Sequence, residues 1–383
     1  VAEGPKGRIY AAPDEIHNAA FKVNEPKWKP DISISGSGRY LVGKPYGIDR
    51  FEQLFSNRQL NALNTFSDLI ETFEERIFND ALRSGMNNDD VSLRDNGRGA
   101  KAYSEAIKFY LSLILDKCAD YWSNCCTWSN TRHTLRGTFG RQAIPLAWDY
   151  AEANPFSSSS GNWNSMTMWT SKALALAPSN IRGYAIQSDA SVQTTSLLKI
   201  ISTDPPYYDN VPYADISDFF YVWLRKSIRN LYPKLFATIT VPKKEELVAA
   251  DHRQGGKEAA KNFFIDGMTN ALSRLAIQAH PAFPITIFYA FKQSETKDSE
   301  TSSTGWETFL SSLIRAGLKI SGTWPMRTEL STRLRGTTSN ALSSSMVLVC
   351  QKRNEDEEII TRKEFRRKLK ETLPLAIRNL SST

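Results

Sequence analysis

The stretch that most constrains the fold is LLKIISTDPPYYDNVPYADISDFFYVWLRKSI, which runs from Leu197 to Ile228. Its first part, Leu197–Ser202, is a mainly apolar run of the kind found in strands of a buried parallel sheet. An acid, two prolines and two tyrosines follow at once. An aromatic-rich helix is then predicted over Asp215–Asn230. A buried strand that leads through a turn into a helix predicts an α/β protein.

Composition bounds the class of protein. The chain of 383 residues has a formal net charge of +7, which fits either a polyanion partner such as nucleic acid or simply an averagely basic protein. Its four cysteines include no CxxC pair, so we expect no metal site and a cytoplasmic location. No apolar run is long enough for a membrane span. The chain begins VAEGPKGRIY, without Met or a signal-peptide pattern, so we expect a piece of a longer protein.

Changes of pattern along the chain predict four parts. Residues 1–55 have little periodicity and are interpreted as an extended arm on the surface. Residues 56–170 are predicted to be mainly helical, because Ser56 and Gln59 form a capping box and apolar residues then recur at helical spacing. Residues 181–352 alternate between strand and helix patterns. Residues 353–383 form a charged tail. Thr361 and Glu364 are predicted to cap a helix there, which is interpreted as a solvated face rather than a binding patch.

The segment 181–352 is interpreted as the second part of a doubly wound, Rossmann-like sheet. An antiparallel β-hairpin closes one sheet edge, and a helix capped by Thr304 and stopped at Gly317 precedes it. A further helix is predicted over Lys257–Ala279. The predicted strands are Tyr184–Gln187, Leu197–Ser202, Ile285–Phe291, Leu318–Thr323 and Met346–Cys350.

The turn after Ser202 carries the chemistry. In open α/β sheets, ligands bind beyond the carboxyl ends of strands, and Asp204 follows such an end directly. Pro205 and Pro206 fix the backbone and remove two amide donors, so a carbonyl there can accept a hydrogen bond. Tyr207 adds a flat ring with a polar tip. Two acceptors beside a ring suit a planar group that bears an NH2, unless the turn is only a rigid Pro-Pro corner.

A conjugated amine is a poor nucleophile. Acceptors that hold its two hydrogens would favour the tetrahedral nitrogen that forms as a methyl group arrives, so catalysis would come from positioning and electrostatics. A base inside a duplex reaches such a pocket only when it is flipped out.

DPPY after a strand resembles the catalytic motif of amino-methyltransferases that use S-adenosylmethionine to methylate adenine N6 or cytosine N4 in DNA. The longer segment TDPPYYDNVPYADISDFFYVWLRKS resembles the DUF1156-type adenine-specific DNA methylases of defence-associated loci. Further segments that carry the resemblance are VAEGPKGRIY, YGIDRFEQLFSNRQLNALNTFSDL, TFGRQAIPLAWDYAEANPF, FYAFKQSE, TGWETFL and TWPMRTEL. The resemblance covers nearly the whole chain and implies a DNA adenine-N6 methyltransferase.

The resemblance also implies roles for residues. Asp204 and the Pro205 carbonyl would accept from the target amine, Pro206 would stiffen the turn, and Tyr207 would stack on the flipped base. Asp189 would lie near the cofactor adenosine, or would only form a turn. Other residues that would shape the rim or line the cleft are Tyr208, Asp209, Asn210, Lys292, Gln293, Glu295, Arg327 and Glu329. For Arg327 and Glu329, an ion pair is an equal alternative.

The chain departs from the family's pattern at the cofactor turn. The glycine-rich turn after the first strand is missing, and GxG occurs only in ISISGSGRY and RDNGRGA, which are interpreted as flexible loops. The chain therefore resembles the C-terminal portion of a methylase, and an upstream portion would supply the cofactor motif. The competing hypotheses are a DNA-binding module without turnover, a subunit of a defence complex, and methylation of cytosine N4.

Overall fold

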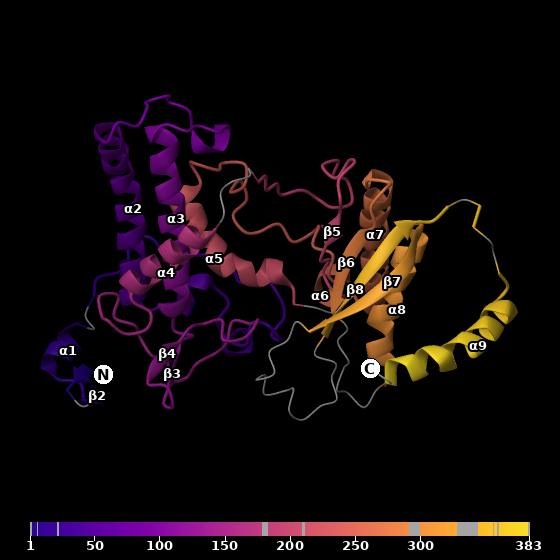
Figure 1. The fold of residues 1–383 in the computed structure, drawn as a ribbon. Coiled ribbons are helices and arrows are strands. Elements are labelled where there is room, and N and C mark those ends of the chain that lie inside the picture. Colours follow the sequence, from indigo (N-terminus) through magenta and orange to yellow (C-terminus); the bar gives the residue numbers. More distant parts are fainter. Residues whose placement is uncertain are drawn as a thin grey trace. The chain divides into compact units, whose positions relative to one another are not determined.

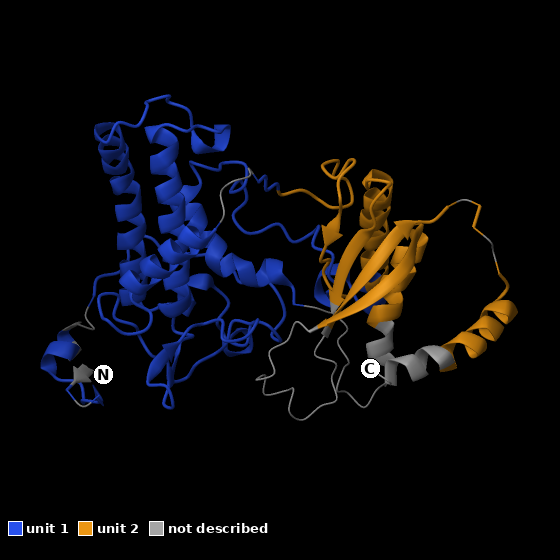
Figure 2. Ribbon diagram, in the orientation of Figure 1, with its two compact units in different colours: residues 1–186, 209–260 blue, residues 187–208, 261–383 orange. Residues whose placement is uncertain are grey.

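The computed structural model describes residues 2–5, 7–20, 23–177, 183–208, 211–290, 299–327, 344–354, 356–357 and 360–381. The chain divides into two compact units (Figure 2): unit 1 holds residues 1–186 and 209–260, and unit 2 holds residues 187–208 and 261–383. The predicted methyltransferase portion is therefore shared between both units, because residues 209–260 group with the N-terminal residues.

Unit 1 is mainly helical. Its helices are α1 (Glu15–Ala20), α2 (Asn57–Arg83), α3 (Ala100–Tyr121), α4 (Trp163–Leu176), α5 (Tyr213–Ile228) and α6 (Asp251–Gln254). Its strands form two small hairpins, β1 (Ala2–Gly4) with β2 (Gly7–Ile9) and β3 (Thr127–Ser129) with β4 (Thr134–Arg136). Short 3-10 turns lie at Lys44–Tyr46, Phe51–Leu54 and Leu93–Asp95. The capping box is confirmed, since Ser56 and Gln59 exchange hydrogen bonds of 2.8 and 3.3 Å at the start of α2.

The core of unit 1 is aromatic and draws on distant segments. Helices α2, α3 and α5 pack against one another (Figure 1), and Trp223 of α5 is fully buried. The Trp223 ring meets the ring of Trp28 edge-on at 5.2 Å and that of Phe55 at 5.6 Å. Part of the predicted surface arm thus belongs to this core, because buried Phe51 and Phe55 lie in it. Single apolar residues without periodicity gave no sign of that role.

Unit 2 is built on a mixed four-stranded sheet of order β5-β6-β8-β7. Its strands are β5 (Ser202–Thr203), β6 (Ile285–Ala290), β7 (Leu318–Arg327) and β8 (Ser344–Lys352). Strand β5 runs parallel to β6, and β8 is antiparallel to both β6 and β7. Its helices are α7 (Lys257–Gln278, which begins in unit 1), α8 (Ser299–Arg315) and α9 (Arg362–Ser381). The α/β class and the antiparallel hairpin at one edge are therefore confirmed.

Helices α7 and α8 cover one face of this sheet (Figure 1). Ile285, Ile287 and Tyr289 alternate toward that face and are buried. Helix α8 ends as predicted: Gly317 has a φ of 77° and its N–H donates to the Ile314 carbonyl. Its start was predicted wrongly, because Thr304 lies inside the helix rather than at its N-cap.

Two predicted strands are wrong. Tyr184–Gln187 forms no strand, and Tyr184 is 79% exposed. The run Leu197–Ser202 enters the sheet only at Ser202, apart from one isolated bridge at Lys199. The physical reason is the lack of a second neighbour: β5 pairs with β6 alone among the described strands. Leu198 also has a φ of 53°, which breaks the extended backbone.

Candidate functional site

The DPPY corner, residues Asp204–Tyr207, leaves the sheet at the carboxyl end of β5. Its parallel register with β6 pairs Ser202 with Thr286 and Thr203 with Ile287, so the corner lies beside the end of β6. The Asp204 side chain is exposed, and Pro206 is exposed as well. Since neither proline can donate a backbone hydrogen bond, the strand pairing ends here. The corner is thus a surface feature, and its carboxylate faces solvent.

Two tyrosines give the corner its shape. The Tyr207 hydroxyl donates to Asp204 Oδ1 over a long 3.5 Å, and its half-buried ring meets the Tyr289 ring edge-on at 4.9 Å. The Tyr208 ring packs edge-on against Phe264 of α7 at 5.3 Å, and its backbone N–H donates to the Tyr289 hydroxyl at 3.3 Å. Helix α7 and strand β6 therefore hold the backbone that follows the prolines.

Tyr289 is a residue of the candidate site that sequence analysis missed. It is buried in β6, and its ring stacks on Phe309 of α8 at 4.0 Å. Burial raises the pKa of Tyr289 to about 12. Its hydroxyl therefore stays neutral and can accept the Tyr208 N–H. The available signal was its place near the end of ITIFYAF, the strand predicted beside the one that leads into DPPY.

Other predicted rim residues follow strand ends, but most lie outside the described residues. Arg327 is the last residue of β7 and pairs with Ser344, while Ala290 at the end of β6 pairs with Ser345. Strands β5, β6 and β7 thus end on the same edge of the sheet. The predicted residues outside the described part are Asp209, Asn210, Lys292, Gln293, Glu295 and Glu329, together with the side chain of Arg327.

Asp189 lies in a turn, and the strand predicted just before it, Tyr184–Gln187, does not form. Its carboxylate accepts from the N–H and the hydroxyl of Ser191, both at 2.8 Å. The backbone N–H of Ser191 lowers the pKa of Asp189 below its ordinary value. This exposed Asx turn matches the turn-forming alternative.

The two GxG segments are packed turns instead of flexible loops, and both lie in unit 1. A Cβ at Gly36 would come within 2.8 Å of the buried Asp215 carboxylate. A Cβ at Gly97 would come within 2.0 Å of the Val91 carbonyl, and the Gly99 N–H donates to Asp89 at 3.0 Å. These glycines serve internal packing. Among the described residues, we find no glycine-rich turn after a strand that fits S-adenosylmethionine.

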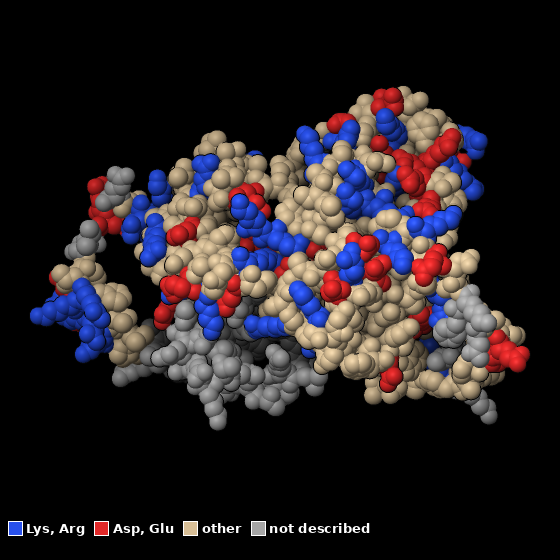
Figure 3. Space-filling model, turned by 180° about the vertical axis from the view of Figure 1, so that it is seen from behind, with Lys and Arg blue, Asp and Glu red and all other residues tan. Residues whose placement is uncertain are grey.

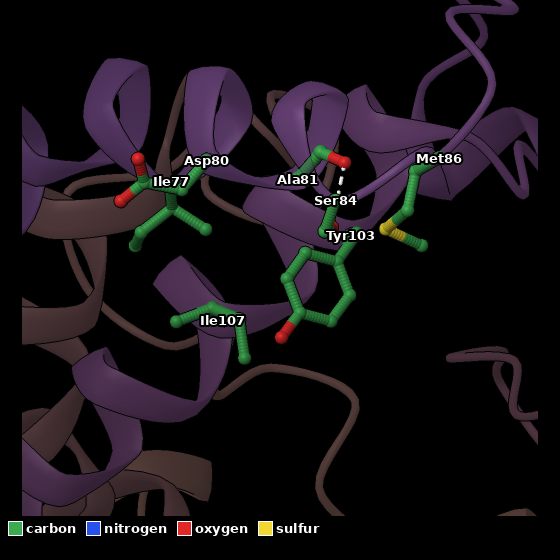
Figure 4. Close-up of a pocket in the computed structure, with 7 residues that line it drawn as sticks. All are labelled: Ile77, Asp80, Ala81, Ser84, Met86, Tyr103 and Ile107. Atoms are coloured by element: carbon green, nitrogen blue, oxygen red, sulfur yellow. Dashed lines mark hydrogen bonds between the residues drawn. The ribbon is translucent and has the colours of Figure 1, made fainter.

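A shallow hollow of about 500 Å³ opens between α2 and α3 (Figure 4). Its lining residues are Ile77, Asp80, Ala81, Ser84, Met86, Tyr103 and Ile107. Two of the polar groups there have partners: the Ser84 hydroxyl donates to the Ala81 carbonyl at 2.8 Å, and Asp80 pairs with Arg83 at 3.1 Å. The hollow contains no predicted site residue, and its groups form no nucleophile–base pair. We therefore place the candidate site at the DPPY corner.

The described part of the chain holds neither a metal-binding cluster nor a membrane-spanning helix. No three His, Cys, Asp or Glu side chains among those residues are grouped so that they could hold a metal ion. None of the described helices is long and apolar enough to cross a membrane.

Comparisons with models of protein families, with curated proteins and with solved structures gave no match.

Proposed function

We propose that this chain carries the target-base half of a DNA amino-methyltransferase, with adenine N6 as the acceptor. The observation that supports this most is the position of the DPPY corner. An exposed Asp204 follows directly from a strand that is paired in parallel, beside the buried Tyr289. That edge is where α/β sheets place their ligands.

The proposed mechanism uses hydrogen-bond acceptors. The Asp204 carboxylate and the Pro205 carbonyl accept the two hydrogens of the exocyclic amine and favour a tetrahedral nitrogen over the planar, conjugated one. Tyr207 offers its ring to the flipped base, since stacking holds any base without reading its edge. Tyr289 and Phe264 hold the backbone of the corner, so the acceptors are positioned before the base arrives.

S-adenosylmethionine would supply the methyl group. The glycines of the described GxG segments are committed to packing, so we assign cofactor binding to an upstream portion and derive no step through it. The finer fold proposal is a Rossmann-like, doubly wound sheet. Strands from that portion would pair with the side of β5 that no described strand covers. We also propose a cytoplasmic location for the protein.

The runner-up is a DNA-binding module without turnover, and the packed GxG turns favour it. A second alternative is methylation of cytosine N4, because the DPPY motif does not determine which base carries the target amine. The third alternative is a structural subunit of a defence complex, and only the helical character of unit 1 supports it.

The test compares Asp204→Asn with Asp266→Asn in the full chain, together with any segment that precedes Val1 in its gene. The two variants lose the same charge at exposed aspartates of unit 2. Methyl transfer to unmethylated plasmid DNA would be quantified by mass spectrometry as N6-methyladenine and N4-methylcytosine. We expect Asp204→Asn to lower transfer at least about 100-fold and Asp266→Asn to retain it.

Transfer near the original rate in Asp204→Asn would contradict the proposed role. Calorimetry with S-adenosylmethionine separates the alternatives further. DNA binding without cofactor binding at millimolar concentration, and without transfer, would favour the binding module. The ratio of the two methylated bases decides between adenine and cytosine.

A further inference from the structure

Helix α9 carries a cationic face that the proposed function does not use. Successive residues of an α-helix turn by about 100°, so residues four apart lie in one row. Arg362, Arg366 and Lys370 form one such row, and Lys363 and Arg367 form the next. Together these five side chains occupy an arc of about 140°. We call them the cationic face of α9.

The two acids of this stretch lie just outside the arc of the five cations. Glu364 is about 60° beyond Arg367, and Glu371 follows Arg367 by four residues, so it borders the face at its C-terminal end. Glu364 is also engaged at the helix start, where its carboxylate accepts from the Thr361 N–H at 2.8 Å and its own N–H donates to the Thr361 hydroxyl at 3.2 Å. This capping box confirms the predicted start of the helix and engages Glu364 at the N-terminal end of α9.

The cationic face is open to solvent. Every residue from Arg362 to Glu371 is exposed. In the described part of the chain, no ion pair involves any of the five cations, whereas many other Lys and Arg side chains pair with carboxylates there. Figure 3 shows Lys and Arg side chains gathered over α9, at the left of the view. Like charges crowded on one helix face repel one another, so the face gains from a polyanion.

We infer that the cationic face of α9 binds the phosphate backbone of DNA. Arg362 and Lys370 lie about 12 Å apart along the helix at 1.5 Å per residue. One DNA strand presents a phosphate about every 3.4 Å along the duplex axis, so three or four phosphates match that length. The five side chains reach out from two neighbouring rows, which suits a series of oxygens rather than one anion. This inference rests on the proposed function because it takes DNA as the ligand.

A lipid surface fits the helix less well. Phe365, Leu369 and Leu373 form an apolar stripe and are 54%, 43% and 47% exposed. The stripe covers an arc of only about 80°, which is narrower than the cationic face. Helices that lie in a membrane interface need a broad apolar face. Because the cationic face is wider than the apolar stripe, α9 is better suited to contacts with phosphates than to a lipid surface.

The test neutralises three cations and measures DNA binding by the full chain. The variant Arg366→Gln/Arg367→Gln/Lys370→Gln is compared with Arg132→Gln/Lys172→Gln/Lys257→Gln. The control removes the same charge at exposed positions elsewhere. Fluorescence anisotropy with a labelled duplex gives Kd over a range of salt concentrations. We expect at least a tenfold weaker Kd for the α9 variant, and a salt slope shallower by about 0.9 for each phosphate that the protein no longer neutralises.

Further measurements distinguish the possible outcomes of this experiment. Equal Kd and equal salt slope for the two triple variants would overturn the inference. So would binding to phosphatidylserine vesicles that is abolished in the α9 variant while its DNA binding is unchanged. Phe365→Ser/Leu369→Ser should leave Kd for DNA within about twofold, because surface changes away from the binding groups have small effects. Failure of methyl transfer in Asp204→Asn, with the difference in Kd between the two triple variants preserved, would concern the DPPY corner and not α9.

Discussion

Unit 1 and unit 2 bury their apolar side chains in different ways. In unit 1, rings from distant segments close a core around Trp223, which is fully buried. In unit 2, described helices cover one face of the sheet, while Trp324 on β7 is 66% exposed and Ile200 beside β5 is 67% exposed. The difference teaches that packed helices and the segments around them can close a core from all sides, whereas a strand depends on the neighbours that flank and cover it.

The two units also differ in the environment of their carboxylates. Asp215 of unit 1 is buried and pairs with Arg253 at 2.7 Å, and buried Asp218 pairs with Lys243 at 2.7 Å. Asp204 of unit 2 is exposed and accepts a long hydrogen bond from Tyr207. Buried, paired acids stabilise a fold only through their partners. An exposed acid on a stiff turn is available to a ligand.

The comparison of cores predicts the largest effect. Trp223→Ala should lower the free energy of unfolding by about 3–5 kcal/mol, because it empties a packed site in unit 1. The matched change in unit 2, Trp324→Ala, should alter it by no more than about 0.5 kcal/mol. Chemical denaturation followed by circular dichroism measures both. Equal changes in the two variants would mean that the exposed face of the sheet is covered in solution.

A buried acid in unit 1 predicts a pH effect. Asp116 of α3 is buried, its Oδ1 has no hydrogen-bond partner in the described part of the chain, and burial raises its pKa well above the ordinary value. The folded state therefore keeps a proton that the unfolded state releases, so this contribution to stability is lost as pH rises from the unfolded toward the folded pKa.

Asp116→Asn cannot ionise and should remove that loss. We expect the variant to gain stability relative to the wild type between about pH 5 and about pH 8. Unfolding free energies at both pH values provide the measurement. A difference that stays constant with pH would show that Asp116 does not titrate in this range.

A smaller effect on stability is expected at Tyr289, which joins the core of unit 2 to the DPPY corner. Tyr289→Phe keeps the ring on Phe309 but removes the hydroxyl that accepts the Tyr208 N–H, which should cost about 1 kcal/mol. The sharper readout is faster hydrogen exchange at the Tyr208 amide. Tyr207→Phe is the control, since its hydroxyl donates to Asp204 over a long 3.5 Å and not to the Tyr208 backbone. The same exchange rate in both variants would argue against a role for Tyr289 in holding the backbone.

The smallest effect on stability is expected at the corner itself. Asp204→Asn should change the free energy of unfolding by less than about 0.5 kcal/mol, because the side chain is exposed. Asp215→Asn, which disturbs a buried ion pair, should cost more. Thermal unfolding of the two variants compares them. A large destabilisation in Asp204→Asn would assign this acid a structural role and weaken the proposed function.

Local patterns predicted much of this fold. The capping boxes at Ser56 and Thr361, the stop at Gly317 and the hairpin of β7 and β8 follow from residues close together in sequence. The predicted strand end before Asp204 was found as well, although the strand is shorter than expected. Such features depend on hydrogen bonds and backbone angles within a few residues.

The wrong predictions concern segments whose structure depends on residues far away in the sequence. Tyr184–Gln187 and the first part of Leu197–Ser202 have strand-like composition, yet the described chain offers them no second partner. Helix α5 follows the corner in sequence but packs in unit 1 through Phe219 and Trp223. Tyr289 was overlooked because its role comes from the register between β5 and β6, which sequence spacing does not reveal.

The chain passes between the two units at residues 186–187, 208–209 and 260–261. Synthesis from the N-terminus therefore releases α2 and α3 before the helix that completes their core, α5, has been made. The DPPY corner emerges in between, ahead of the strand and helices that hold its tyrosines. Early in biosynthesis the nascent protein thus exposes two unfinished apolar surfaces at once, and transiently exposed surface of this kind is prone to aggregation.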